Sequence, residues 1–222
     1  MNLALFDLDD TLIPLDSDHA WGEFVVREGW VDADEFKRLN DEFFETYKAG
    51  RLDVHAYIEF ATRPLRERPL QEAQAAHERF MAEVITPRLY DSARSLVREH
   101  IDQGDLVALV TATNEFVTAP IARAFGIDDL IAVKLERGPG GTITGRIDGV
   151  PSYREGKVTR VEQWLASRGK RWSDFGRTSV YSDSINDLPL LEKATHPVAT
   201  NPSPPLEAIA RERGWRILNL FK

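Results

Sequence analysis

The chain has 222 residues, 42% of them hydrophobic, with no cysteine and a formal net charge of -8. This content supports a buried core, and the lack of cysteine excludes disulfides, zinc–thiolate sites and a cysteine nucleophile. Nucleic acid and anionic membranes are disfavoured as partners, because a negative surface repels them. No apolar run reaches the roughly 20 residues that cross a bilayer, and no signal-peptide pattern is visible. We therefore expect a cytoplasmic protein, either a monomer or a homodimer.

The first predicted element is a short buried strand at residues 1–6, "MNLALF". From residue 15 to residue 85 the pattern is helical only. One stripe in this segment consists of Phe36, Leu39, Phe43 and Tyr47, at the spacing of one helix face. These patterns predict an all-helical insertion at residues 15–85, placed directly after the first strand.

After Pro87 helical patterns alternate with short apolar strands, which is typical of a parallel sheet covered on both faces. We therefore predict an α/β fold with a doubly wound parallel sheet, made of residues 1–14 and 86–222. The expected helices are at 89–103, 115–126, 153–169 and 185–194, and the expected strands are at 105–113, 177–182 and 196–200. Two further strands are expected on either side of a glycine-rich turn within 130–149, and a last helix and strand are expected at the end of the chain.

Polar side chains follow three of the predicted strands. They are Asp7 and Asp9 after the first strand, Thr111 and Thr113 in "LVTAT", and Ser182 and Asp183 in "YSDSIND". In open parallel sheets the ligand crevice lies beyond the carboxyl ends of the strands. The sequence therefore predicts that these side chains meet in one crevice.

Each of these signals has a structural alternative when taken alone. Acidic residues after a strand are common in turns and as helix caps, and Asp183 with Asp187 fits a cap followed by a first-turn acid. Thr111 could simply end a strand, and most lysines, such as Lys157 near a helix start, are solvated. Together, however, these acids form an oxygen-rich pocket of the kind that selects magnesium over zinc.

The joint pattern resembles the haloacid dehalogenase superfamily in its phosphatase branch. "DLDDT" matches the first motif, Thr111 the second, Lys157 the third and "SDSIND" the fourth. The long helical segment after the first motif is similar to the helical cap of the phosphoserine-phosphatase-like subgroup. Two departures are Ser182, where glycine usually precedes the aspartate, and Ala112 after Thr111.

The resemblance implies a magnesium-dependent phosphatase that acts on a small phosphorylated metabolite through an aspartyl-phosphate. It implies that Asp7 is the nucleophile, that Asp9 is the acid and base, and that Thr111 and Lys157 bind the phosphoryl group. Magnesium would be held by Asp7, the Asp9 carbonyl and Asp183, with Asp187 steadying the metal's waters or Lys157. Transfer to an acceptor other than water, and a non-catalytic binding protein on this scaffold, remain alternatives.

Substrate choice is expected to come from the helical cap. Asp16 stands where phosphoserine phosphatases have an amine-binding glutamate, and Arg63 falls roughly where they have a carboxylate-binding arginine. Ala112 and Asn186 are further candidates for contact with the substrate. The alternatives for the two cap residues are a helix-start acid and a solvated arginine. The implied substrates resemble phosphoserine, histidinol phosphate or another amino-alcohol phosphate.

Overall fold

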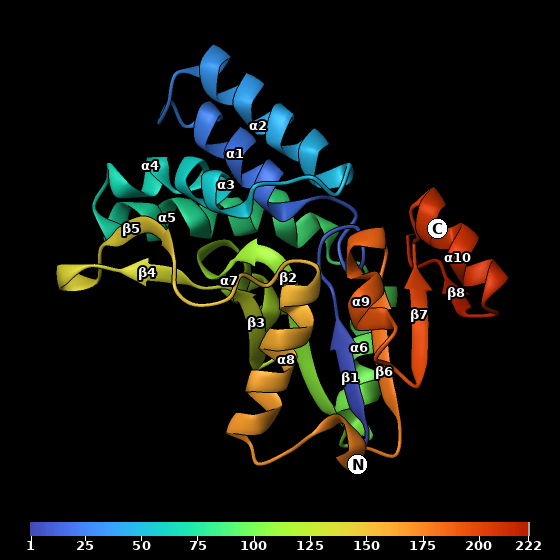
Figure 1. Cartoon of the computed structure of the whole chain (residues 1–222). Helices are drawn as coiled ribbons and strands as arrows, with labels where there is room; N and C mark the ends of the chain where they lie inside the picture. The colour runs from blue at the N-terminus through green and yellow to red at the C-terminus, as the bar shows by residue number, and fades with distance from the viewer. Residues whose placement is uncertain (222) are drawn as a thin grey trace.

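The computed structural model describes residues 1–221, and Figure 1 shows a twisted sheet beneath a layer of helices. The sheet has six parallel strands in the order β3-β2-β1-β6-β7-β8, which confirms the predicted doubly wound sheet. A separate antiparallel hairpin pairs β4 with β5. The strands are β1 (Leu3–Phe6), β2 (Leu106–Asn114), β3 (Asp129–Val133), β4 (Leu135–Arg137), β5 (Ile143–Ile147), β6 (Thr178–Ser182), β7 (His196–Thr200) and β8 (Arg216–Leu218).

The helices fall into an inserted group and a group that alternates with the strands. The inserted group comprises α1 (Ser17–Arg27), α2 (Ala33–Lys48), α3 (Val54–Ala61), α4 (Arg63–Arg66) and α5 (Leu70–Phe80), which continues as a π-helical turn at Met81–Ile85. The alternating group comprises α6 (Asp91–Asp102), α7 (Glu115–Ala124), α8 (Glu155–Ser167), α9 (Leu188–Leu191) and α10 (Pro204–Glu212).

Alternation along β1 distributes its side chains between two hydrophobic clusters. Leu3 and Leu5 pack in the cluster that contains residues of α8, α9 and α10, whereas Ala4 and Phe6 pack in the cluster with α6 and α7. Neighbouring side chains of a strand point to opposite faces, so a central strand covered on both sides is apolar throughout. All four residues of β1 are buried, as the sequence "LALF" predicts.

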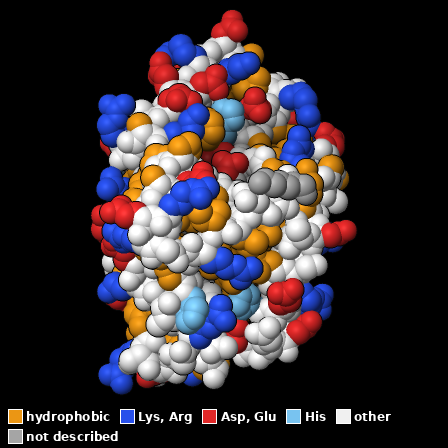
Figure 2. All heavy atoms as spheres, turned by 90° about the vertical axis from the view of Figure 1, so that its right-hand side faces the viewer, with side chains coloured by type: hydrophobic (Ala, Val, Ile, Leu, Met, Phe, Trp, Pro, Cys, Tyr) orange, Lys and Arg blue, Asp and Glu red, His pale blue; other side chains and the backbone are white. Residues whose placement is uncertain are grey.

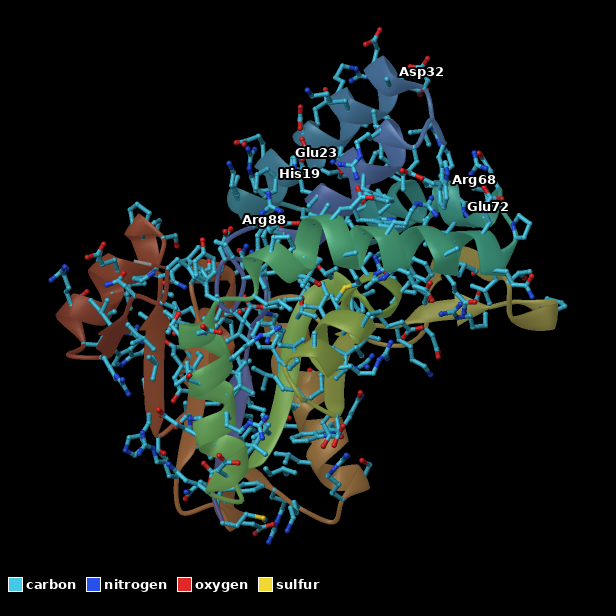
Figure 3. All side chains as sticks on the ribbon, turned by 180° about the vertical axis from the view of Figure 1, so that it is seen from behind. His19, Glu23, Asp32, Arg68, Glu72 and Arg88 are labelled. Atoms are coloured by element: carbon cyan, nitrogen blue, oxygen red, sulfur yellow. The ribbon has the colours of Figure 1, made fainter. Side chains whose placement is uncertain are left out.

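The inserted helices share a hydrophobic core with the sheet. Trp21, Phe24 and Phe80 belong to the same cluster as Phe6 of β1. Trp21 also stacks on Phe24 and meets Phe116 of α7 edge-on. Seen from behind in Figure 3, α5 runs across the top of the sheet, and α1 and α2 stand above it with Asp32 at their far tip. The division into a cap at 15–85 and a core at 1–14 and 86–222 remains a prediction.

The observed elements depart from the expected ones in two places. The helix expected at 185–194 is a 3-10 turn at Ile185–Asp187 followed by only four α-helical residues, because the chain must already enter β7 at His196. β2 extends to Asn114, one residue beyond the expected end. Among residues 1–221, no helix is both long enough and apolar enough to cross a membrane.

The face that carries β8 and α10 intersperses acidic and basic side chains instead of gathering one sign into a patch (Figure 2).

Candidate active site

The sheet order brings the predicted acids together at one edge. β1 lies between β2 and β6, so the ends of these three strands are neighbours. The strand order also reverses at β1, because the chain goes from β1 to β2 and β3 on one side and later to β6 on the other. Crevices of parallel sheets form at such switch points. Asp7 directly follows the central strand and occupies this position.

Lys157 joins two of the predicted acids. Its Nζ lies 2.7 Å from Asp7 Oδ1 and 2.7 Å from Asp187 Oδ2, and the lysine side chain is only 1% exposed. Burial lowers the pKa of Lys157, but the negative charges of Asp187 and Asp7 outweigh this effect and raise it. The third residue of α8 is thus a buried, permanently charged cation in the crevice, and not a solvated lysine.

Thr11 links the second oxygen of Asp7 to Asp183. Its hydroxyl lies 3.1 Å from Asp7 Oδ2 and 3.0 Å from Asp183 Oδ1, and it accepts from the Asp183 backbone N–H at 3.0 Å. Burial, together with the charges of Asp7, Asp10 and Asp187, raises the pKa of Asp183 well above its ordinary value. Lys157 pairs with Asp7 and Asp187, whereas Asp183 has no ion pair with a lysine or arginine among residues 1–221.

Asp9 has partners that differ from those of Asp7. Its Oδ1 accepts from the Ser17 backbone N–H at 2.8 Å, and its Oδ2 accepts from the Thr113 hydroxyl at 2.9 Å. Burial raises the pKa of Asp9 well above its ordinary value, and the charges of Asp16 and Asp7 raise it further. Asp9 is therefore held by a backbone N–H and a hydroxyl, whereas Asp7 is held by the charged Lys157.

Asp187 accepts a hydrogen bond from Ser182, one of the two residues at which the sequence departs from the haloacid dehalogenase pattern. The Ser182 hydroxyl donates to Asp187 Oδ2 at 2.8 Å and also accepts from the Ser184 backbone N–H. Burial raises the pKa of Asp187 to about 6, although Lys157 acts in the opposite direction. Ser182 thus supplies a hydrogen bond that glycine could not.

The oxygen donors at Asp7 and Asp183 suit a hard divalent cation. Asp7 and Asp187 are buried against one lysine, Asp183 is half-buried beside them, and a dication would offset this excess negative charge. Among residues 1–221, no three His, Cys, Asp or Glu side chains are grouped tightly enough to hold a metal without other donors.

A narrow pocket extends from Asp9 and Thr113 into the inserted helices. Its cavity volume is about 30 Å³ in this conformation. It is lined by Asp9, Asp16, Asp18, His19, Asn40, Phe43, Phe44, Tyr47, Leu52, Tyr57, Ala112 and Thr113. Three carboxylates and four aromatic rings face the pocket, with neither lysine nor arginine in its lining.

Asp16 and Ala112 line this pocket, but Arg63 does not. Asp16 also caps α1, since its Oδ1 accepts from the His19 backbone N–H. The Arg63 guanidinium instead lies over the ring of Phe36 and 3.8 Å from Glu35. Asp16 therefore both caps α1 and lines the pocket. Arg63 lies outside the pocket and is partly exposed, which corresponds to the alternative of a solvated arginine.

Asn186 and Thr111, two other residues predicted to contact the substrate, make hydrogen bonds within the protein in this conformation. The Asn186 amide donates to the backbone oxygen of Tyr47 at 3.0 Å and so ties the crevice to the end of α2. Thr111 is fully buried, and its hydroxyl accepts from the Thr113 backbone N–H at 3.1 Å. The structure brings Thr111 to the end of β2 beside β1, within the crevice-forming edge of the sheet.

Sequence reasoning missed two residues of the pocket, Asp18 and Tyr57. Thr113, which the sequence placed with Thr111 at the end of the same strand, fixes Asp9 by a hydrogen bond that the sequence did not predict. No sequence signal distinguishes Asp18 from an ordinary first-turn acid of α1.

Comparison with known proteins gives a consistent picture. Residues 4–192 match the family model of haloacid dehalogenase-like hydrolases. The chain is 45% identical to a histidinol-phosphatase of Neisseria meningitidis, with 98% of each chain covered. It is 33% identical to a phosphoserine phosphatase of Mycobacterium tuberculosis, over 96% of this chain and 69% of that one.

Two solved structures show the same fold. A protein of unknown function from Bordetella pertussis superposes with a TM-score of 0.94 at 52% identity, with 99% of each chain covered. A substrate-bound phosphoserine phosphatase superposes with a TM-score of 0.68 at 19% identity, over 98% of this chain and 92% of that one. The second similarity confirms the fold class.

Proposed function

Because the chain belongs to the haloacid dehalogenase-like hydrolase family, we propose that it is a magnesium-dependent phosphatase of a small phosphorylated amino alcohol. One observation carries this proposal: Asp7 is held by Lys157 and Thr11, whereas Asp9, two residues further on, is held separately by the Ser17 backbone N–H and the Thr113 hydroxyl. A carboxylate nucleophile and a separate protonated carboxyl are the two groups that phosphomonoester hydrolysis through an acyl phosphate requires.

In the proposed reaction Asp7 attacks phosphorus, and the ester bond to the alcohol oxygen breaks. Asp9 gives its proton to that departing oxygen and later takes a proton from the water that cleaves the aspartyl-phosphate. Lys157 and the Thr111 end of β2 offset the negative charge on the phosphoryl oxygens. Magnesium held by Asp7, Asp183 and the Asp9 carbonyl would supply further positive charge there.

The pocket supports a cationic substrate over an amino acid phosphate. A phosphoserine carboxylate would need a cation, yet the pocket is lined by three aspartates and by neither lysine nor arginine. An ammonium group, by contrast, complements Asp16. The similarity to a histidinol-phosphatase at 45% identity favours histidinol phosphate, which carries an amine and an imidazole but no carboxylate.

The first experiment measures phosphate release from 4-nitrophenyl phosphate with and without magnesium, and then from histidinol phosphate, phosphoserine and phosphoethanolamine. We expect magnesium-dependent turnover, with the highest kcat/KM for histidinol phosphate. Asp7→Asn should abolish turnover and the acid-stable phosphate label on the protein, whereas the matched variant Asp10→Asn on the same loop should retain both. Full activity of Asp7→Asn would contradict the assigned nucleophile.

A further inference from the structure

Asp18 presents an unpaired carboxylate oxygen in the pocket. The residue is 4% exposed, and its Oδ2 has no hydrogen-bond partner among residues 1–221. A buried polar atom without a partner destabilises a protein, because it has lost its hydrogen bonds to water. Such atoms are rare in folded proteins, and each one calls for an explanation.

The orientation of Asp18 is fixed by the end of β2. Asn114 Oδ1 accepts from the Val117 backbone N–H and so caps α7, which leaves Asn114 Nδ2 to donate to Asp18 Oδ1 at 3.2 Å. The amide cannot turn over without losing this cap. Asp18 Oδ1 is therefore the satisfied oxygen, and Oδ2 is the one left free to accept.

The surroundings of Asp18 suit a flat ring that carries an N–H. Phe43, Phe44, Tyr47 and Tyr57 line the same pocket, and aromatic side chains stack on planar rings and attract cations through their faces. Burial raises the pKa of Asp18 to about 7, and the charge of Asp9 raises it further, while the nearby Tyr57 hydroxyl and the Asn114 amide act in the opposite direction as donors. Of these two donors, the Asn114 amide alone makes a hydrogen bond to the carboxylate in this conformation. A donor that reaches the carboxylate would relieve its desolvation.

We propose that Asp18 is a specificity residue that accepts a hydrogen bond from a ring N–H of the substrate, such as that of an imidazole, beyond the amine site at Asp16. This inference rests on the proposed function, because it concerns the substrate of the same crevice. The two acids at the start of α1 then have different roles. Asp16 binds the amine of the substrate, and Asp18 distinguishes substrates by whether their ring has an N–H.

The test compares two phosphate esters that differ only at the ring. Histidinol phosphate carries an imidazole, and phenylalaninol phosphate carries the same amine with a phenyl ring that has no N–H. We expect the wild-type protein to favour histidinol phosphate by at least about tenfold in kcat/KM, the ratio that 1.4 kcal/mol represents. The comparison uses unaltered protein, so it does not depend on the folding of any variant.

The Asp18→Asn variant should bring the two kcat/KM values within about threefold of each other, while Asp34→Asn, on the exposed start of α2, should keep the wild-type ratio. Equal turnover of both esters by the wild-type protein, or an unchanged ratio in Asp18→Asn, would overturn the assignment. Failure of the proposed function has another signature, namely no magnesium-dependent release of phosphate from 4-nitrophenyl phosphate.

Discussion

The Asp18→Asn substitution should change how stability depends on pH. The buried Asp18 has a pKa of about 7, against an ordinary value of 3.8. Between these two values the folded state keeps a proton that the unfolded state releases, so the free energy of unfolding falls as pH rises from about 4 to about 7. The neutral asparagine is nearly isosteric, keeps the acceptor for Asn114, and removes this dependence.

The expected magnitude follows from the difference between the two pKa values. A difference of roughly three corresponds to on the order of 4 kcal/mol, since each step of one in pKa is about 1.4 kcal/mol. Both proteins carry a neutral side chain at pH 4, so they start from similar stabilities. By pH 8 the variant should be more stable than the wild-type protein, by up to that amount.

Urea unfolding followed by tryptophan fluorescence measures this effect at pH 4.5, 6, 7 and 8. Other titratable groups that face Asp18, namely Asp9, Asp16, His19 and Tyr57, remain in both proteins and contribute equally to first order. The exposed variant Asp34→Asn should follow the wild-type curve. Parallel pH curves for Asp18→Asn and the wild-type protein would show that burial does not hold the Asp18 proton.

Three further changes test the packing around the site. Lys157→Met should lower the unfolding free energy by about 3–5 kcal/mol in urea, because it leaves two buried carboxylates without their cation; a loss under 1 kcal/mol would contradict the buried pairing. Gly156→Ala should reduce both stability and phosphatase kcat, because a Cβ there would lie 2.1 Å from the Pro151 carbonyl oxygen; wild-type thermal stability and kcat would refute this contact. Burial lowers the pKa of His77, so the unfolded state binds more protons than the folded state, and wild-type stability should fall as the pH drops below about 6.5. In His77→Gln this part of the decline in unfolding free energy, measured in urea, should be lost. An unchanged decline would refute the burial argument.

The crevice was predictable because it depends on a topological rule. Asp7 and Asp183 directly follow strands and Thr111 lies in the last half of β2, and parallel strands of a doubly wound sheet bring their ends to one edge. Hydrophobic alternation is enough to locate such strands. The contact of Lys157 with Asp7 spans 150 positions along the sequence, yet it follows once the order of elements is known.

The pocket was less predictable because it depends on how helices turn against one another. Arg63 was a candidate for the site from its approximate position, but α3 ends at Ala61 and a new short helix begins at Arg63 itself. This break leaves its guanidinium over Phe36. Spacing along a helix indicates which residues share a face, but not which neighbour that face meets.

The acids of the crevice and the pocket share one physical property, which connects stability to function. Burial raises the pKa of Asp9, Asp16, Asp18 and Asp183, so the ligand-free protein holds several carboxylates in surroundings that disfavour their charge. A bound cation relieves that repulsion only in the folded state. Magnesium and an amine-bearing ligand should therefore each raise the unfolding free energy by RT ln(1 + [L]/Kd) and do so more strongly at pH 8 than at pH 5. A site built from neutral side chains would give the same stabilisation at both pH values.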